Sequence, residues 1–287
     1  MPVNGCDCSL VIKTVHREID VPYSEETLRE AVSFLQEEAG IEGDGVCRGL
    51  RKNGGITGCV VTALTMETAP VLLCLALGAA GPAVFVSETR DLYKSRLDLL
   101  PVEDSEYFEL IQDRGGERKL FEVCRVKGFE LRVMREEAIQ LKLDICGERQ
   151  PAGYPYTDAF DREQGERFSG DCVTYRINGA EYKNIYGLTL STKKEGGTKT
   201  ELWIKRVLEN GPDLPVIIEE MTLTARLLRD TYEYRYVGIF RITIKRLVLV
   251  SDETNIDSTG AVMGPLRYSA AGTVVAEVFF RGGETVT

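Results

Sequence analysis

The residues that could carry chemistry in this chain are few. A hydrolase triad needs a histidine as its base, and the sequence has one, His16, between Val15 and Arg17. A cysteine paired with His16 is the remaining catalytic option, and it is the less favoured one. We therefore expect no catalytic residues and no enzymatic activity.

Metal-binding patterns are incomplete. Zinc sites usually combine histidines with paired C-x-x-C motifs, whereas Cys6-x-Cys8 is a single short pair with no second pair to match it. The acidic stretch 252–257 has oxygen ligands at alternate positions, but it lacks the glycine and the distal glutamate of a calcium loop. We expect no metal ion and no cofactor.

The cysteine content favours reduced thiols. An even count could mean four disulfides, but the chain is long and several cysteines lie inside apolar stretches, which is typical of thiols that fill a core. The eight are Cys6, Cys8, Cys47, Cys59, Cys74, Cys124, Cys146 and Cys172.

Two further groups of residues could bind ligands. Residues 40–58 hold seven glycines with Arg48, Arg51 and Lys52 among them, but their spacing matches neither a P-loop nor a dinucleotide-binding motif, so a long loop or hairpin is favoured. Tyrosines can stack on sugars or bases, and they also suit strand surfaces and subunit interfaces, which we favour here. These tyrosines are at positions 154, 156, 182, 186, 232, 234 and 236.

Charge and hydropathy exclude other classes. The net charge of −10 disfavours general nucleic-acid binding and attachment to anionic lipid, because both need clustered Lys and Arg. The N-terminus lacks a signal-peptide pattern. Residues 69–86 carry no charge, but Gly78, Gly81 and Pro82 interrupt them, so we expect a short buried helix at 69–77 and then a strand. We expect synthesis in the cytoplasm and no membrane partner.

A hairpin lies at the centre of the expected fold. Residues 128–145 alternate apolar and polar side chains on both sides of the polar turn Arg135-Glu136-Glu137, which is typical of two strands with one buried face. Residues 187–204 align with them over eighteen positions without a gap, placing Gly187 on Gly128 and Lys194 on Arg135. The sequence therefore predicts a duplicated β unit.

The other segments complete a mainly β (α+β) chain. We expect an antiparallel β-sandwich or barrel with short flanking helices and two β-rich halves, 1–148 and 149–287, joined across the polar stretch 147–171. A helix is predicted at 25–39, because Ser24 is a good N-cap and the apolar residues that follow recur at helical spacing. Those apolar residues are Leu28, Ala31, Val32 and Leu35.

The order of these pieces resembles the tail tube proteins of tailed phages and phage-derived particles. The resemblance is carried by residues 58–78, a strand running into a short helix that ends at glycine, and by the hairpin at 124–147. It continues in the second half, from 173–179 through the repeated hairpin to 239–250. The longer members of that family contain two similar β-rich halves in one chain.

The resemblance implies a structural function without enzymatic activity. Subunits would join into a homo-oligomeric ring, such as a hexamer, and the rings would stack into a hollow tube that contacts other tail proteins and conducts DNA non-specifically. The location would then be a virion or a phage-like tail particle, and an acidic protein would suit a lumen that does not grip DNA. The alternative is a cytosolic β-rich protein that binds carbohydrate or peptide in a tyrosine-lined pocket. The candidate inter-subunit contact residues are chosen only because they are basic and lie in glycine-rich loops or hairpins. They are Arg48, Arg51, Lys52, Lys193 and Lys194.

Overall fold

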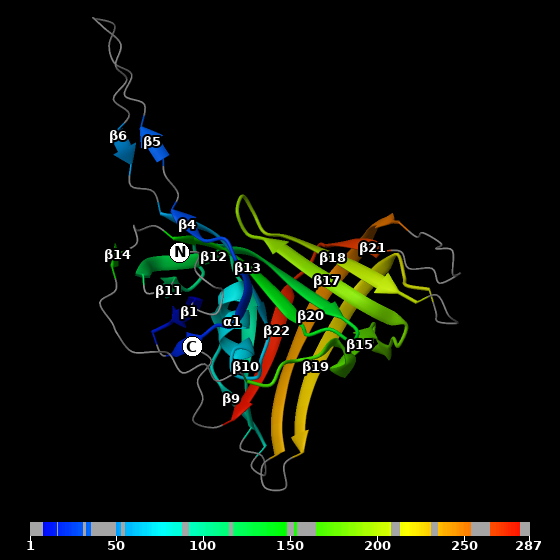
Figure 1. The fold of residues 1–287 in the computed structure, drawn as a ribbon. Coiled ribbons are helices and arrows are strands. Elements are labelled where there is room, and N and C mark those ends of the chain that lie inside the picture. Colours follow the sequence, from blue (N-terminus) through cyan, green and yellow to red (C-terminus); the bar gives the residue numbers. More distant parts are fainter. Residues whose placement is uncertain are drawn as a thin grey trace, which may run out of the picture.

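The computed structural model of the chain is mainly β. It contains one α-helix and one large antiparallel sheet in the part of the chain that it describes (Figure 1). The mainly β class predicted from the sequence is therefore confirmed. The described residues are 8–15, 17–30, 33–35, 50–52, 55–87, 92–114, 117–147, 152–153, 165–207, 213–230, 235–253 and 265–281.

The elements are mostly strands, which range from two residues in β4 to eighteen in β12 and β20. Those of the first half are β1 Cys8–Lys13, β2 Glu18–Asp20, β3 Tyr23–Glu26, β4 Arg29–Glu30, β5 Ser33–Leu35, β6 Leu50–Lys52, β7 Ile56–Ala63, α1 Ala69–Leu77, β8 Gly78–Ala80, β9 Val84–Ser87, β10 Leu92–Leu99, β11 Phe108–Arg114, β12 Glu117–Met134, β13 Gln140–Gly147 and β14 Ala152–Gly153. After a 3-10 turn at Gly170–Cys172 follow β15 Val173–Ile177, β16 Ala180–Glu181, β17 Ile185–Lys193, β18 Lys199–Arg206, β19 Ile217–Asp230, β20 Arg235–Asp252, β21 Pro265–Ala270 and β22 Val274–Arg281.

Two layers of strands pack face to face. The first layer runs in the order β7-β13-β12-β17-β18-β21. The second layer runs β15-β19-β20-β22-β10, and β21 also pairs with β20, where the sheet passes from one layer to the other. Leu131 and Leu190 of the first layer line one narrow internal gap together with Leu223 and Ile242 of the second. The apolar faces of the two layers therefore meet, as in a β-sandwich.

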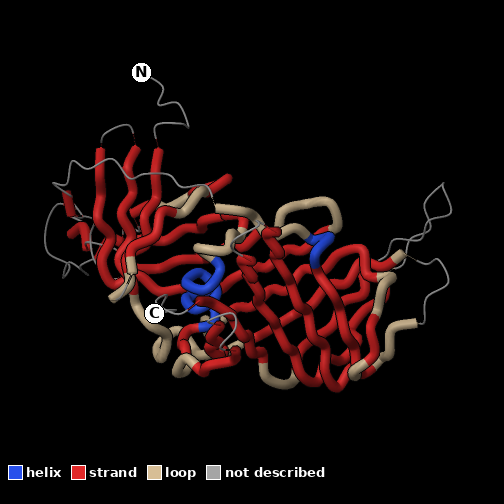
Figure 2. The backbone as a smooth tube through the Cα atoms, turned by 90° about the horizontal axis from the view of Figure 1, so that it is seen from below, coloured by secondary structure: helices blue, strands red, loops and turns tan. Residues whose placement is uncertain are grey.

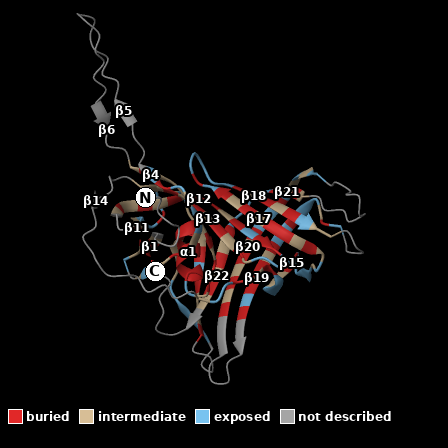
Figure 3. Cartoon of the chain, in the orientation of Figure 1, coloured by how far each residue is buried: buried red, intermediate tan, exposed pale blue. Residues whose placement is uncertain are grey.

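The helix α1 lies inside the protein, as predicted for residues 69–77. All nine of its residues are buried, and Pro70 occupies the first turn, where a missing N–H costs nothing. A helix that is apolar on every side must be enclosed on every side. α1 contacts β8, β10, β12 and β22, and Figures 2 and 3 show it among the strands and buried.

The predicted repeat is present, and its two copies lie side by side. The strands β12 and β17 pair antiparallel with Leu131 opposite Leu190, and Gly128 and Gly187 occupy equivalent places at the two ends of the ladder. A local twofold axis therefore passes between Leu131 and Leu190. Each first strand also has a register shift just before its glycine, between Val126 and Gly128 and between Ile185 and Gly187.

The two hairpins have equivalent strand bounds, but they differ in their pairing register. Leu131 lies opposite Leu141 in the first hairpin, whereas the equivalent Leu190 lies opposite Leu202 in the second. Leu202 therefore takes the cross-strand place of Leu141, so the pairing register of the second hairpin is displaced by two residues although five residues separate the two strands in both hairpins. An even shift keeps every side chain on its own face of the sheet, so the sequence pattern does not reveal it.

The helix predicted at 25–39 is also wrong. The segment instead begins with the short strands β3 and β4, which pair with β7 through contacts such as Glu25 with Val61 and Arg29 with Thr57. Leu28 is buried between them. The exposed edge of β7 offers backbone partners, and this tertiary pairing overrides a local helical pattern. β5 follows, pairs with β6 alone among the described strands, and stands apart from the two layers in Figure 1.

Two strands differ from the prediction in length or existence. The stretch 118–125 and the first strand of the central hairpin form the single strand β12, which bends where Val123 adopts a positive φ of 53°. A residue in that conformation marks a bulge and strengthens the local twist. β21 was not predicted, and it covers the edges of β18 and β20.

Candidate functional site

The described residues contain no assembled catalytic or metal-binding group. His16 lies outside them, and so do Cys6 and Cys47. No cluster of three His, Cys, Asp or Glu side chains within the described ranges could hold a metal ion. The described cysteines Cys59, Cys74, Cys124, Cys146 and Cys172 are all free thiols. The features that remain are three: a sheet edge, a polar hollow and a buried lysine.

The sheet edge is strand β9. Among the described strands it pairs with β10 alone, so no described strand covers its other side. Val84, Phe85 and Val86 are 51%, 46% and 45% exposed. Successive side chains of a strand point to opposite faces, so both faces of this edge are apolar. Phe85 makes an edge-to-face contact with Tyr93 of β10, with 5.3 Å between ring centroids, which holds the strand in place.

Three other described edges are short or carry charged residues. β16 is two residues long and exposed, and β2 ends in charged residues at Glu18 and Asp20. β3 contains Glu25 and Glu26. Short, charged edges resist pairing with other chains, whereas a neutral apolar edge invites it. β9 is therefore the edge best suited to receive another strand.

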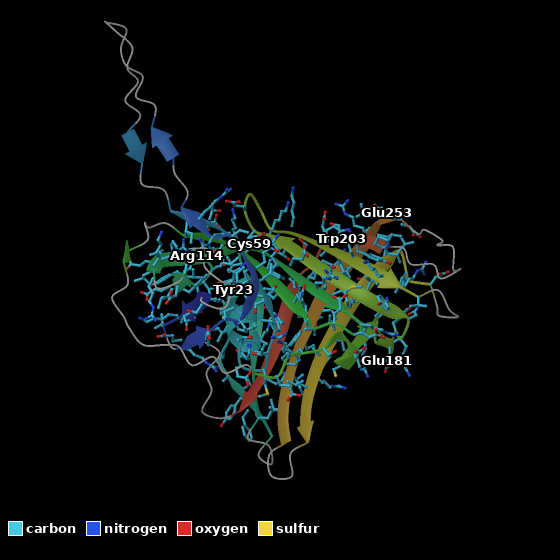
Figure 4. All side chains as sticks on the ribbon, in the orientation of Figure 1. Tyr23, Cys59, Arg114, Glu181, Trp203 and Glu253 are labelled. Carbon is cyan, nitrogen blue, oxygen red and sulfur yellow. The ribbon has the colours of Figure 1, made fainter. Side chains whose placement is uncertain are left out.

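The polar hollow lies on the outer face of the second layer and has a volume of about 430 Å³. Threonines of neighbouring strands form its floor, because outward positions of β15, β19 and β20 lie side by side in the ladder. Its lining residues are Thr174, Arg176, Gly179, Glu181, Glu220, Thr222, Thr224, Arg226, Arg241, Thr243 and Glu277. Glu181, labelled in Figure 4, marks this layer, and Trp203 marks the first layer.

The charges of the hollow are partly paired. Glu277 accepts hydrogen bonds from Lys94 at 2.9 Å and from Arg241 at 3.0 Å. Burial alone would raise the pKa of this carboxyl, but the two cations outweigh that effect and lower it. Along the strands Glu181 lies opposite Arg176, and Glu220 lies opposite Lys245. Arg226 lies opposite Ile239, and the lining as a whole holds three arginines and three glutamates, so its charges balance.

The buried lysine is Lys194, in the turn between β17 and β18. Its side chain is 2% exposed, and its ammonium donates to the Leu77 carbonyl at 3.1 Å and to Ser105 Oγ at 3.2 Å. The Leu77 carbonyl is one of the last in α1, where the helix dipole places negative charge. Lys194 therefore joins the second hairpin to the end of α1 and to the segment that follows β10.

Burial changes the acid–base behaviour of this lysine. It lowers the pKa of the Lys194 ammonium from 10.5 to about 8, because the charged form loses hydration. The nearby Cys74 thiol is also buried, which raises its pKa to about 12 and keeps it protonated near neutral pH. A neutral thiol gives little compensation to the ammonium. Its stabilising contacts are therefore the two hydrogen bonds and the helix end.

The predicted contact residues have different locations. Arg48 lies outside the described residues, and Arg51 and Lys52 belong to β6, where only the backbone is described. Lys193 is exposed at the end of β17. Lys194 is buried in its own chain, which removes it from the candidate contact residues. Sequence reasoning assigned it to a polar turn because nothing local distinguishes a lysine that folds inward.

Sequence reasoning also missed the two surface features. The run Val84-Phe85-Val86 was predicted to be a strand, but its three consecutive apolar residues are equally typical of a buried one. The alternating threonines Thr222 and Thr224 of β19 were a usable signal for a polar outer face. Of the tyrosines considered as ligand-binding residues, Tyr182 and Tyr186 are half-buried, and neither lines the hollow.

Comparison with known proteins gives no relative. No protein-family model matches this chain, and no curated protein matches it. Across the described segments, α1 is the longest helix at nine residues, and no helix there is long and apolar enough to cross a bilayer.

Proposed function

We propose that the chain is a structural subunit that assembles with copies of itself through its sheet edges, as in a phage tail tube. The observation that carries the proposal is the β9 edge, where Val84, Phe85 and Val86 are exposed on a strand that pairs with β10 alone among the described strands. Joining such an edge to a strand of a neighbouring copy would satisfy its backbone groups and cover its apolar side chains.

Other features support assembly through a limited set of edges. The inner edges of the two hairpins are used within the chain, because β12 and β17 pair with each other. An interface between copies must therefore use peripheral strands. A second exposed apolar patch lies where Ile217 faces Val248 across the β19–β20 ladder, with Val216 and Val250 beside them. Patches of this kind mark protein contacts more often than isolated apolar residues do.

The stacked, DNA-conducting tube is the finer form of the proposal. The resemblance in element order supports it, and so does the pair β5–β6, which stands apart from the layers as a contact arm between rings would (Figure 1). The ring number, the tail partners and the virion location rest on the resemblance alone.

The test is a concentration series followed by light scattering and negative-stain electron microscopy. Wild-type protein should form rings or hollow tubes as concentration rises. Val86→Lys should raise the concentration of half-assembly by about tenfold or more, because a lysine on an edge strand opposes pairing. Val15→Lys is the matched control, since Val15 is 81% exposed outside any strand, and it should assemble like the wild type.

Two results would overturn the proposal. One is wild-type protein that stays monomeric up to the highest soluble concentration. The other is an equal effect of Val86→Lys and Val15→Lys on assembly, which would show that assembly does not depend on the β9 edge.

The second candidate function is a binding protein, and the hollow on the second layer is the observation that favours it. Its threonine floor and mixed charges offer donors and acceptors to a polar ligand. A ligand screen by NMR on dilute protein, with resonances of Thr222, Thr224 and Thr243 as reporters, tests this candidate. Shifts at these residues with a sugar or peptide would favour binding, and a silent hollow would exclude it for the classes screened.

A further inference from the structure

The large apolar side chains that remain exposed gather at two places. Seven of the nine that are exposed among the described residues lie either on β9 or where the start of β19 meets β20, so their exposure is not scattered. Two separate groups of this kind indicate two contact surfaces on one chain. The group on β9 is Val84, Phe85 and Val86, and the other group, which we call the β19 patch, is Val216, Ile217, Val248 and Val250.

The β19 patch lies on a strand with an open side. Ile217 faces Val248 across the β19–β20 ladder. On the other side of β19 the described partner is β15, whose ladder covers residues 221–225. Beyond that ladder Asn178 Oδ1 accepts from the backbone amides of residues 219 and 220. No described strand therefore pairs with this side of β19 at residues 216–218, where the apolar side chains are exposed.

The two groups lie at opposite ends of the long strands. The ladders β9–β10, β10–β22 and β22–β20 connect Val84 through Lys94 and Phe279 to Ile239 of β20. The β19 patch lies nine positions further along β20, at Val248, which is about 30 Å away at about 3.3 Å per residue. Figure 1 shows β9 near one end of the strands and β21, beside the β19 patch, near the other. One copy therefore cannot cover one group with the other, whereas two copies placed head to tail can.

We propose that β9 of one copy docks on the β19 patch of a second copy, as an added strand along the open side of β19. The inference rests on the self-assembly proposed above and names the two surfaces that meet. The apolar side chains of β9 would lie beside Ile217 and cover the patch, while its backbone groups pair with residues 216–218. Because the two surfaces differ, the contact is heterologous, and repeating it generates a ring or a filament.

The form and charge of β9 favour this pairing over a contact of each group with its own copy. β9 is exposed at Val84, Phe85 and Val86 in succession, so it projects from the sandwich. Two projecting strands of four residues that met edge to edge would touch over few residues, whereas stable interfaces involve about 20–30 residues on each side. A head-to-tail contact instead brings the broad ends of two sandwiches together. β9 also carries no charge, so it buries no unpaired charge against the apolar patch.

The test uses two full-length variants, each blocked at one of the two surfaces. Val86→Lys places a charge on β9, and Val248→Lys places one on the β19 patch. Both positions are exposed, at 45% and 42%, so the fold should survive, and thermal unfolding verifies it. Each variant alone should need at least about tenfold higher concentration than wild type to assemble, because every copy in the sample lacks the same surface.

An equimolar mixture of the two variants is the decisive sample. The Val86→Lys protein keeps the β19 patch and the Val248→Lys protein keeps β9, so one contact can form between them. We expect a dimer with one copy of each variant at concentrations at which each alone is monomeric. No larger species should form, because both free ends of that dimer are blocked. Native mass spectrometry with one variant labelled with nitrogen-15 identifies the composition.

Neighbouring positions and a matched control separate the surfaces from local effects. Val84→Lys and Ile217→Lys block the same two surfaces and should give the same pattern, alone and mixed. Val15→Lys adds the same charge at an exposed valine outside both groups, and it should assemble like the wild type.

The remaining outcomes distinguish this inference from the proposal on which it rests. If each variant alone forms dimers, each surface pairs with its own copy, so the inference is wrong and self-assembly stands. If Val248→Lys assembles like the wild type, the β19 patch takes no part and the inference is wrong. If both variants stay monomeric alone and in the mixture, the two surfaces do not meet and the inference is wrong. If the wild type never assembles, the self-assembly proposal has failed and this inference fails with it.

Discussion

Arg135 and Lys194 occupy the same place in two copies of one hairpin, and the protein uses them in opposite ways. Each follows the first strand of its hairpin, and the local twofold axis relates the two strands. Arg135 lies in solvent and donates to the Lys183 carbonyl, whereas Lys194 is buried and donates to Leu77 and Ser105. The repeat thus sets the backbone register, and the neighbours of each turn decide where its cation lies.

The surroundings explain the divergence. The second turn faces the end of α1, where the Leu77 carbonyl and the Ser105 hydroxyl accept from a buried ammonium. The first turn packs on the 3-10 turn Gly170–Cys172 before β15, where the Glu136 amide donates to the Asp171 carboxylate. Variants at equivalent positions can therefore separate what the repeat conserves from what its context changes.

The largest expected effect concerns the twofold axis itself. Leu131→Ala and Leu190→Ala should each lower the free energy of unfolding by about 2–5 kcal/mol, because both side chains are fully buried. Since the two leucines face each other across the same ladder, the two losses should agree within about 1 kcal/mol. Urea denaturation of both variants measures this. A much larger difference would show that the two copies do not share one symmetric environment.

The second effect is pH-dependent and belongs to Lys194 alone. Its pKa is about 8 in the folded protein and near 10.5 when unfolded, so the unfolded chain binds more protons between these values. Stability contributed by this lysine should therefore rise from pH 8 to 10.5, by about 3 kcal/mol in all. Below pH 8 the lysine is charged in both states and imposes the full cost of its burial.

Lys194→Met isolates that contribution. The variant should be more stable than wild type at pH 7, because the Leu77 carbonyl keeps its bond from the Leu100 amide and no charge is buried. Its advantage should shrink as pH rises to 10.5. The difference between the two proteins is the quantity to follow, since burial raises the pKa of Cys124 to about 12 and lowers stability above pH 9 in both. A constant difference across this range would contradict the assignment.

A smaller effect distinguishes the two repeat glycines. A Cβ at Gly128 would lie 2.9 Å from the Thr192 carbonyl, and one at Gly187 would lie 3.1 Å from the Val133 carbonyl and against the Met134 side chain. Gly128→Ala should cost about 1–3 kcal/mol because a backbone atom must move. Gly187→Ala should cost less, since its closest neighbour is a flexible thioether. Thermal unfolding of the pair gives the order, and the reverse order would contradict this account.

The sequence predicted an element correctly wherever the spacing of its apolar residues is compatible with only one kind of secondary structure. The alternation in the two hairpins and the uniformly apolar run of α1 predicted those elements at the right residues. The prediction of a helix at 25–39 was wrong because its apolar spacing is also compatible with short strands. Pairing with the edge of β7 favours the strands. The strand β21 was not predicted for a similar reason. It forms by pairing with β18 and β20, and the local sequence does not show that these strands lie beside it.

The candidate surfaces were less accessible to sequence analysis. An apolar strand is read as buried, and the exposure of Phe85 follows from the absence of a neighbour beyond β9 in the described fold. Lys194 stands in a turn rich in glycine and charge, where an inward side chain has no local signature. In both cases, exposure or burial depends on which distant elements pack against the residue. The local spacing of residue types in a single sequence does not show this packing.

The smallest expected effect completes the comparison of the two turns. Arg135→Met removes an exposed guanidinium whose one hydrogen bond goes to a surface carbonyl, so the free energy of unfolding should change by no more than about 0.5 kcal/mol. The change should also be independent of pH between 8 and 10.5, because the arginine stays charged in both states. Equivalent positions of one repeat would then give different results. Lys194→Met would change the free energy of unfolding in a pH-dependent way, whereas Arg135→Met would leave it almost unchanged. If Arg135→Met instead reproduced the pH dependence of Lys194→Met, the effect would belong to the repeat, and burial beside α1 would not be its cause.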